Sequence, residues 1–311
     1  MGKLIKDAHS VWNTLNGIFL VFKPAGIHYL GTLNTLNLNL QRDFNKLEVR
    51  PPMKYVSIEG PTNKEMRVVV RDSYADNPLV VGPRFREKNF RMVTVNNLDI
   101  DTSGVLVVAI NYGTRLRYVF KEFRPTVLYK VKGILGQMRR NNFMDGAIVE
   151  KSTWKHIRRE HIDRVCASMQ ASHQKMMFQL SGLDIQSQEA YELAVKGPIR
   201  PNDPNIPLLY SIKCINFTPP EFTLEIVCIN TSSEYLKSVT AEIGIKLHST
   251  AHCNYLHCSQ YGLFHVKDSL LSKHWNLSNI LNNMNMCQNL ISKHSSILSE
   301  KQPNLAMQIA T

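Results

Sequence analysis

The chain has 311 residues, which is enough for a well-buried core and leaves room for one large domain or a domain with an appendage. Its 37 Lys and Arg exceed its 25 Asp and Glu, and the net charge of +12 favours a polyanionic partner such as nucleic acid, although ordinary basic enzymes carry similar charge. The six cysteines form no secreted disulfide pattern, and no apolar run approaches the roughly 20 residues that cross a bilayer. These properties predict a soluble protein with reduced thiols.

The first 16 residues carry a helical pattern with a single acidic side chain. Its apolar positions are Leu4, Ala8, Val11 and Leu15. The pattern is compatible with an organelle-targeting helix, but the stretch has no Arg and a strand motif begins directly afterwards, which does not fit a long cleavable presequence. We interpret residues 1–16 as a lead, for which mitochondrial targeting is one reading, although the stretch alone does not favour it.

The first strand runs from Gly17 into a turn that ends at Gly26, because its apolar run is bounded by Gly and then by Pro-Ala-Gly. Lys23 stands at the end of this strand. Between His28 and about Arg91, Pro-Pro and Gly-Pro pairs interrupt short apolar runs, so we interpret this stretch as strands and loops. A loop that contains Asp99 then leads into a buried strand from Gly104 to Ile110.

Helices and strands alternate irregularly along the rest of the chain. We expect helices at Thr114–Phe123, Glu160–Cys166, Gln186–Val195 and Glu234–Gly244, and strands at Tyr129–Leu135 and Thr223–Ile229. Since there are no regular βαβ repeats, the pattern predicts an α+β fold with a central mixed, largely antiparallel sheet flanked by helices. An apolar stripe predicts a C-terminal helix within 267–291, and the polar residues 292–311 predict a disordered tail.

Two carboxylates, Asp99 and Asp101, lie in the loop before the Gly104 strand. A carboxylate held where a tight turn meets a buried strand is a plausible nucleophile or base. On the residues alone, a solvated turn with side-chain to backbone hydrogen bonds explains the loop better.

Two separated segments, Gly17–Gly26 and Leu98–Leu106, resemble the leading motifs of TruB-type pseudouridine synthases, which isomerise uridine within RNA. The resemblance implies that Asp99, directly after the leucine, is the catalytic residue and that Asp101 is not. The loop also resembles that of the RluA branch, which Asp101 would suit. The segment Glu189–Gly197 is similar to a helix end that TruB proteins have and the RluA branch lacks, so TruB is favoured.

Three shorter segments resemble the animal mitochondrial branch of the TruB family. They are Pro78–Pro83, Ala171–Lys175 and Pro219–Phe222. The resemblance covers roughly 17–279, and it implies a mitochondrial location, in the matrix. It also implies that RNA is the partner, as mitochondrial mRNA, rRNA or tRNA, together with mitochondrial ribosome-assembly proteins.

The resemblance also assigns roles to individual side chains. Tyr129 matches the aromatic residue that stacks on the target base and transfers a proton, although a Tyr that opens a strand is more often a packing residue. Lys237 stands where the family has an arginine that pairs with the catalytic aspartate, and it loses that arginine's bidentate fork. Lys23, Pro24 and Tyr191 match structural or RNA-binding positions.

The reaction that the resemblance implies needs no cofactor, and the sequence carries no glycine-rich phosphate loop. The family's usual Leu-Arg-Arg-Thr is replaced by Leu256–Ser259, and nearby His and Cys residues could suggest a metal site. Their irregular spacing favours a strand with no metal ligand. The basic clusters Arg139–Arg140 and Lys155–Arg159 could contact RNA phosphates or form solvated faces.

Two functions remain. The first is a pseudouridine synthase whose catalytic domain spans 17–266 and which has no PUA domain, because about 45 residues after Val266 are too few for one. The second is a TruB-fold RNA-binding or mitochondrial ribosome-assembly factor with weak or no catalysis. The reason for considering it is Lys237, which stands where the family has an arginine.

Overall fold

A central eight-stranded sheet organises the molecule. The computed structural model describes residues 7–294 except 52, 183, 185, 196–199, 201, 202 and 204. The strand order is β1-β5-β11-β6-β10-β9, with β4 beside β5 and β12 beside β11. The bounds are β1 Gly17–Lys23, β4 Met92–Thr94, β5 Thr102–Ile110, β6 Val127–Leu135, β9 Leu208–Thr218, β10 Glu221–Ile229, β11 Ala251–Tyr261 and β12 Phe264–His265.

Within this sheet, β5 pairs with β11 in parallel, and the pairs β1–β5, β4–β5, β6–β11, β6–β10, β9–β10 and β11–β12 are antiparallel. All nine residues of β5 are buried, as expected for an apolar run covered on both faces. The predicted α+β fold with a mixed, largely antiparallel sheet is therefore confirmed.

Gly104 allows β5 and β11 to approach closely. Its φ of +132° lies in a region that other residues avoid, and a Cβ there would overlap the carbonyl oxygen of Cys258 on β11. The parallel pairing depends on this close approach, since Cys258 is the residue opposite Gly104.

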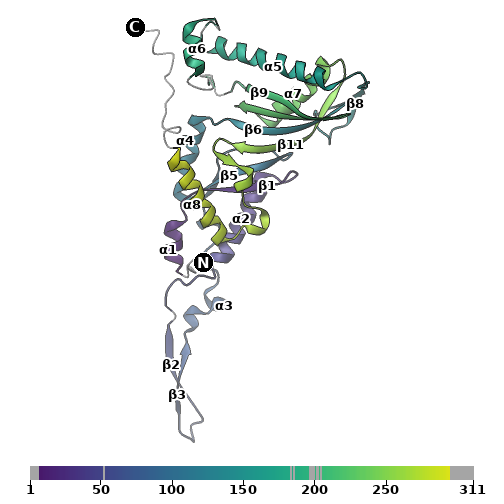
Figure 1. Ribbon diagram of the computed structural model, residues 1–311. Coiled ribbons are helices and arrows are strands. Elements are labelled where there is room, and N and C mark those ends of the chain that lie inside the picture. Colours follow the sequence, from purple (N-terminus) through teal and green to yellow (C-terminus); the bar gives the residue numbers. More distant parts are fainter. Residues whose placement is uncertain are drawn as a thin grey trace.

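Helices cover the sheet on several sides (Figure 1). Their bounds are α1 Ala8–Thr14, α2 Tyr29–Phe44, α3 Pro78–Val81, α4 Leu116–Phe123, α5 Arg159–Leu180, α6 Gln188–Val195, α7 Ser233–Lys246 and α8 Leu277–Lys293. Short 3-10 helices are η1 Tyr74–Asp76, η2 Glu87–Asn89, η3 Asn111–Arg115, η4 Val266–Asp268 and η5 Ser272–His274. The helix α5 packs on β9, α7 on β11 and α8 on β1. None of the helices in the described part of the chain is long and apolar enough to cross a membrane.

The interpretation of 28–91 as strands and loops is wrong over α2. Leu33, Leu36, Leu40 and Phe44 form its buried face at helical spacing, and the His28 side chain caps its first turn. The proline and glycine breakers begin only after this helix. The helix α5 has 22 residues, far more than the segment expected from Glu160, and strand β9 was not predicted.

The C-terminal helix α8 begins at Leu277, although the apolar stripe starts earlier. The backbone N–H of Leu277 donates to the Asp43 carboxylate at 3.0 Å, and the Asn283 amide oxygen accepts from the backbone of Leu20 at 2.7 Å. These bonds fix α8 to α2 and β1. The tail predicted to be disordered lies mostly outside the described residues, as do the first six residues of the lead.

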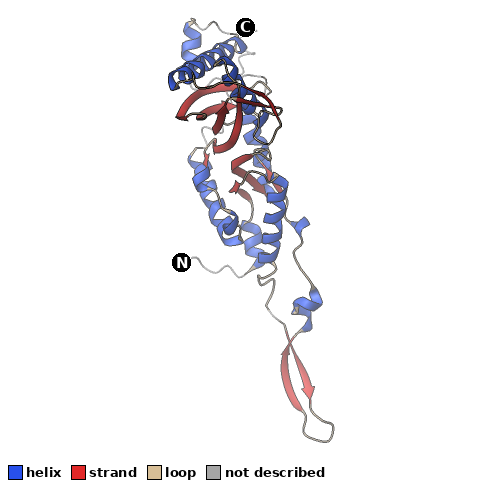
Figure 2. Ribbon diagram, turned by 90° about the vertical axis from the view of Figure 1, so that its right-hand side faces the viewer, coloured by secondary structure: helices blue, strands red, loops and turns tan. Residues whose placement is uncertain are grey.

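A two-stranded hairpin projects away from the rest of the molecule, at the end opposite to α5 and α6 (Figures 1 and 2). It consists of β2, Lys54–Glu59, and β3, Arg67–Asp72. One face is aliphatic and more than half exposed at each position, namely Val56, Ile58, Val68 and Val70. A second small sheet pairs β7, Gln137–Arg139, with β8, Ile148–Lys151.

Candidate active site

The Asp99 loop lies where three elements meet. The loop leads into β5, and it lies next to the end of β1 because Lys23 is paired with Gly104. The first turns of α7 contact the loop through hydrogen bonds to its two carboxylates. The sequence places these elements far apart, and the sheet order brings them together.

Lys23 fixes the backbone of this loop. Its side chain is fully buried, and its ammonium group donates to the carbonyl oxygens of Asp99 at 2.8 Å, Thr102 at 2.8 Å and Ile100 at 3.2 Å. It also donates to its neighbour Pro24 at 3.2 Å. Burial lowers the pKa of Lys23 to about 8, and the charges of Asp101 and Asp99 oppose that shift. The lysine therefore stabilises the loop through its carbonyl groups, and it forms no ion pair with the carboxylate of Asp99 or Asp101.

The Asp99 carboxylate accepts a hydrogen bond from the Ser233 hydroxyl. Ser233 is the first residue of α7, and the preceding Ser232 caps the helix by accepting from the backbone of Tyr235. Asp99 thus lies at a helix N-terminus, which favours a negative charge. Sequence reasoning missed Ser233, because a serine pair before a helix indicates a cap and carries no sign of a contact 134 residues away.

Lys237, one turn further along α7, pairs with Asp101. Its ammonium group lies 2.6 Å from the Asp101 carboxylate and 3.5 Å from that of Glu234. Burial alone lowers the pKa of Lys237, but its hydrogen bond to Asp101 and the charge of that carboxylate outweigh burial and raise it. The resemblance led us to expect a pair with Asp99. A lysine presents one compact ammonium group, and here that group is used by Asp101.

Tyr129 lies buried on β6, beside Cys258 of β11 and Ile226 of β10. Burial raises the pKa of its phenol well above the usual range, and among the smaller contributions is the negative charge of Asp99. The phenol therefore stays protonated, close enough to Asp99 to respond to its charge.

Tyr191 is not brought to the loop. It lies on α6 with its side chain 66% exposed. The matched segment on α5 does reach α7, since His173 shares a hydrogen bond of 3.1 Å with the Tyr235 hydroxyl. Burial lowers the pKa of His173.

A polar cluster on the far side of the loop contains His257, at a position where the family has arginine. The Ser103 hydroxyl lies 3.0 Å from both the His257 ring and the Tyr255 hydroxyl, and the two rings stack at 5.8 Å. Burial lowers the pKa of His257, and the charge of Lys130 adds to the effect. Among the described residues, no group of three or more His, Cys, Asp or Glu side chains could hold a metal ion.

Similarity to known proteins identifies the family of this chain. The profile of "TruB family pseudouridylate synthase (N terminal domain)" matches residues 90–232. The mitochondrial pseudouridylate synthase TRUB2 of Xenopus tropicalis is 38% identical over 288 residues, which cover 90% of this chain and 88% of that protein. The human protein of the same name is 36% identical over 273 residues, covering 86% and 82%. In an archaeal box H/ACA sRNP Nop10-Cbf5 complex, a chain of 14% identity matches with a TM-score of 0.48, over 91% of this chain and 60% of that one.

The chain therefore belongs to the TruB family, and it is a pseudouridine synthase, an isomerase that acts on RNA. Within the family it is similar to the mitochondrial TRUB2 proteins of vertebrates, and a mitochondrial location follows from that similarity.

Proposed function

We propose that this chain converts uridine to pseudouridine in mitochondrial mRNA or rRNA, in the matrix, with Asp99 as the catalytic carboxylate. The observation that carries the proposal is the position of Asp99. Its carboxylate lies at the N-terminus of α7, on a loop whose carbonyl groups Lys23 holds, and its charge reaches the buried phenol of Tyr129. We further propose residues 1–16 as the targeting lead, 17–266 as the catalytic unit and 267–291 as its C-terminal helical segment.

The reaction breaks the bond between N1 of uracil and C1′ of the ribose, turns the base and joins C1′ to C5. Asp99 attacks C1′ as a nucleophile or removes the proton at C2′ as a base, and either role requires a carboxylate in a fixed direction. The Ser233 hydroxyl supplies that direction, since it binds one carboxylate oxygen and leaves the other for the substrate.

Tyr129 contacts the uracil base of the target nucleotide. A uridine that leaves its RNA stack loses stacking energy, and an aromatic ring against the flipped base replaces part of it. Because burial keeps the phenol protonated, it can relay the proton that C5 loses only by releasing its own proton in the same step, to an oxygen of the flipped base or to water.

One observation favours the second candidate, an RNA-binding or ribosome-assembly factor with weak catalysis. Lys237 forms its ion pair with Asp101, and among the described residues the Asp99 carboxylate takes part in no ion pair. A catalytic carboxylate without a cationic partner is held by hydrogen bonding alone.

Pseudouridine mapping on mitochondrial RNA distinguishes the two candidates. The wild-type protein is compared with Asp99→Ala and with Asp101→Ala, a matched loss of a carboxylate from the same loop. We expect Asp99→Ala to lower the rate about a thousandfold or more and Asp101→Ala to lower it much less. RNA binding, measured in parallel by mobility shift, should be equal. If wild type forms no more pseudouridine than Asp99→Ala while both bind RNA, the binding factor is the correct function.

The matrix location has its own test. A fluorescent fusion of the full chain should enter mitochondria and resist protease after the outer membrane is opened. A fusion that stays outside the organelle contradicts the assignment.

A further inference from the structure

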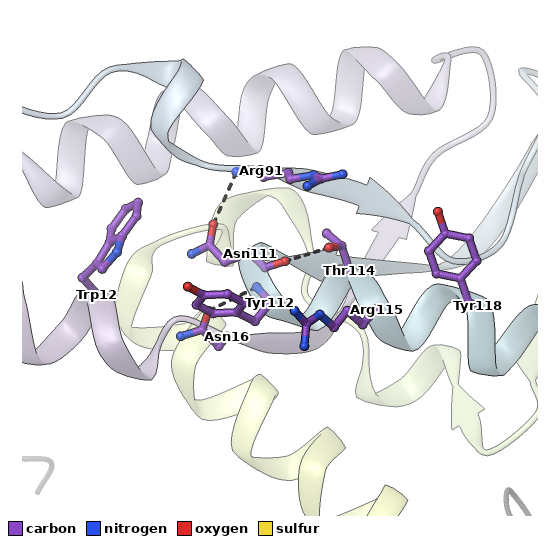
Figure 3. Close-up of a pocket in the computed structure, with 8 residues that line it drawn as sticks. All are labelled: Trp12, Asn16, Arg91, Asn111, Tyr112, Thr114, Arg115 and Tyr118. Carbon is purple, nitrogen blue, oxygen red and sulfur yellow. Dashed lines mark hydrogen bonds between the residues drawn. The ribbon is translucent and has the colours of Figure 1, made fainter.

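A cavity lies at the other end of β5 from the Asp99 loop (Figure 3). Its volume is about 410 Å³, and it is lined by η3, by the start of α4 and by residues from the α1 and β4 regions. Because β5 has nine residues, its two ends lie about 26 Å apart, so this cavity cannot hold the uridine that reacts at Asp99.

Exposed aromatic rings border the cavity. Tyr112 is 74% exposed and Tyr118 is 71% exposed, whereas the indole of Trp12 is partly buried and stacks on Phe85 at 6.1 Å. Figure 3 shows Trp12 and Tyr118 on opposite sides of the cavity. Large aromatic faces left in water beside a cavity offer a stacking surface for a planar ligand.

Two arginines lie between these rings (Figure 3). Arg91 and Arg115 are exposed, and neither forms an ion pair within the described part of the chain. The Arg115 guanidinium lies over the Tyr112 ring at 5.9 Å, and Arg117 and Lys121 follow on α4. The described residues that line the cavity include no acidic side chain, so its charge suits an anion.

The asparagines of the cavity support its wall. The Asn111 amide group donates to the Leu15 carbonyl at 2.8 Å, and its oxygen accepts from the backbone of Arg91 at 3.4 Å. The Asn16 oxygen accepts from the backbone of Tyr112 at 3.2 Å. Since these amides are engaged within the protein, the cavity has rings for stacking and cations for phosphate, but little with which to read base edges.

We propose that this cavity anchors an unpaired nucleotide of the substrate RNA, outside the active site and without preference for its base. The base stacks on Tyr112 and Tyr118, and Arg91 and Arg115 bind the flanking phosphates. The inference rests on the proposed function only in taking RNA as the ligand. It gives the enzyme a second hold on RNA at a distance from the reacting uridine.

The test uses the full chain and a five-residue oligoadenylate labelled with a fluorophore, which contains no uridine and cannot be isomerised. Its binding is followed by anisotropy and by quenching of Trp12 fluorescence, with Trp12→Phe to identify that signal among the three tryptophans. The double variant Tyr112→Ala/Arg115→Ala should bind at least about tenfold more weakly. Arg117→Ala removes the same charge two residues further along, in the first turn of α4, without lining the cavity, and it should change the affinity less than about twofold.

Two further results separate this inference from the proposed function. With substrate RNA, the double variant should raise KM at least about fivefold and leave the single-turnover rate at saturating RNA unchanged. Equal oligoadenylate binding by wild type and double variant overturns the anchor, even if the synthase is active. Oligoadenylate binding that depends on Tyr112 and Arg115 supports the anchor, even if the protein proves inactive.

A third probe checks the role of the rings. Inorganic polyphosphate that binds as tightly as oligoadenylate, with no loss in affinity of either probe on Tyr112→Ala, would show that charge alone acts there and would overturn the nucleotide assignment.

Discussion

The two ends of β5 differ in the environment of their cationic side chains. At the Asp99 end the cations Lys23 and Lys237 are buried, and each has a hydrogen-bond partner within 2.8 Å. At the other end Arg91 and Arg115 are exposed and form no ion pair with any described residue. Burying a charge costs free energy unless the charge is paired. A buried and paired cation, in turn, holds the groups around it in fixed positions. Chemistry needs such fixed atoms, whereas a site that accepts any nucleotide needs side chains free to adapt.

The largest effect should come from removing the buried cation. Lys23→Met leaves the carbonyl oxygens of the Asp99 loop without their donor and should lower the free energy of unfolding by about 3–5 kcal/mol. Arg115→Met, at the exposed end, should change it by less than about 0.5 kcal/mol. Urea unfolding at pH 7 measures both. Equal losses for the two variants would erase the difference between the ends of β5.

Because the pKa of Lys23 is lowered on folding, its contribution to the free energy of unfolding depends on pH. Its value falls from 10.5 to about 8 on folding, so between these pH values the unfolded chain binds more protons and the contribution of Lys23 to stability rises with pH. The stability of wild type relative to Lys23→Met should therefore increase by about 3 kcal/mol from pH 7 to pH 10.5. The cysteines and tyrosines titrate in both proteins and largely cancel. A constant difference across this range would contradict the lowered pKa.

A double-mutant cycle can show which aspartate Lys237 serves. Lys237→Met combined with Asp101→Asn should give a coupling energy of about 1–3 kcal/mol, because the two groups lie 2.6 Å apart. The same lysine variant combined with Asp99→Asn should give a coupling of less than about 0.5 kcal/mol. The reverse pattern would restore the partner that the family resemblance suggested.

The smallest effect separates two adjacent serines. Ser233→Ala should slow the reaction about tenfold while leaving stability nearly unchanged, since it removes a hydrogen bond to the Asp99 carboxylate. Ser232→Ala should instead cost about 1 kcal/mol of stability through the lost helix cap and leave the rate within about twofold. Single-turnover kinetics and urea unfolding of the two variants, side by side, measure the split. A rate loss shared equally by both would mean that the helix end matters as a whole, with no special role for Ser233.

The sequence was most informative at the Asp99 loop. A continuous apolar run predicts a buried strand, and the resemblance of segments far apart in the chain, Gly17–Gly26 and Leu98–Leu106, makes Asp99 the candidate catalytic residue. The contacts that position Asp99 come from Lys23 and Ser233, 76 and 134 residues away, and only the sheet order joins them. Lys237 shows the same limit, because its position predicts a role near the loop but cannot decide between two carboxylates two residues apart.

The helix α2 and the cavity at the other end of β5 were not predicted, for two different reasons. The leucine spacing of α2 by itself indicates a helix, and the proline and glycine pairs that favour strands and loops lie only after it. The nucleotide-sized cavity could not have been predicted, because Trp12, Arg91 and Tyr118 have no common motif and meet only after α1, β4 and α4 pack together.

Gly104 has a consequence for how this gene can change over time. Every amino-acid replacement of a glycine adds at least one carbon, and here that carbon would collide with the backbone of β11. Silent mutations can accumulate in this codon, but other changes are removed by selection as long as the loop before it is in use. A reading frame that has lost this glycine is therefore a sign of a decaying copy, even where the neighbouring aspartates are still present.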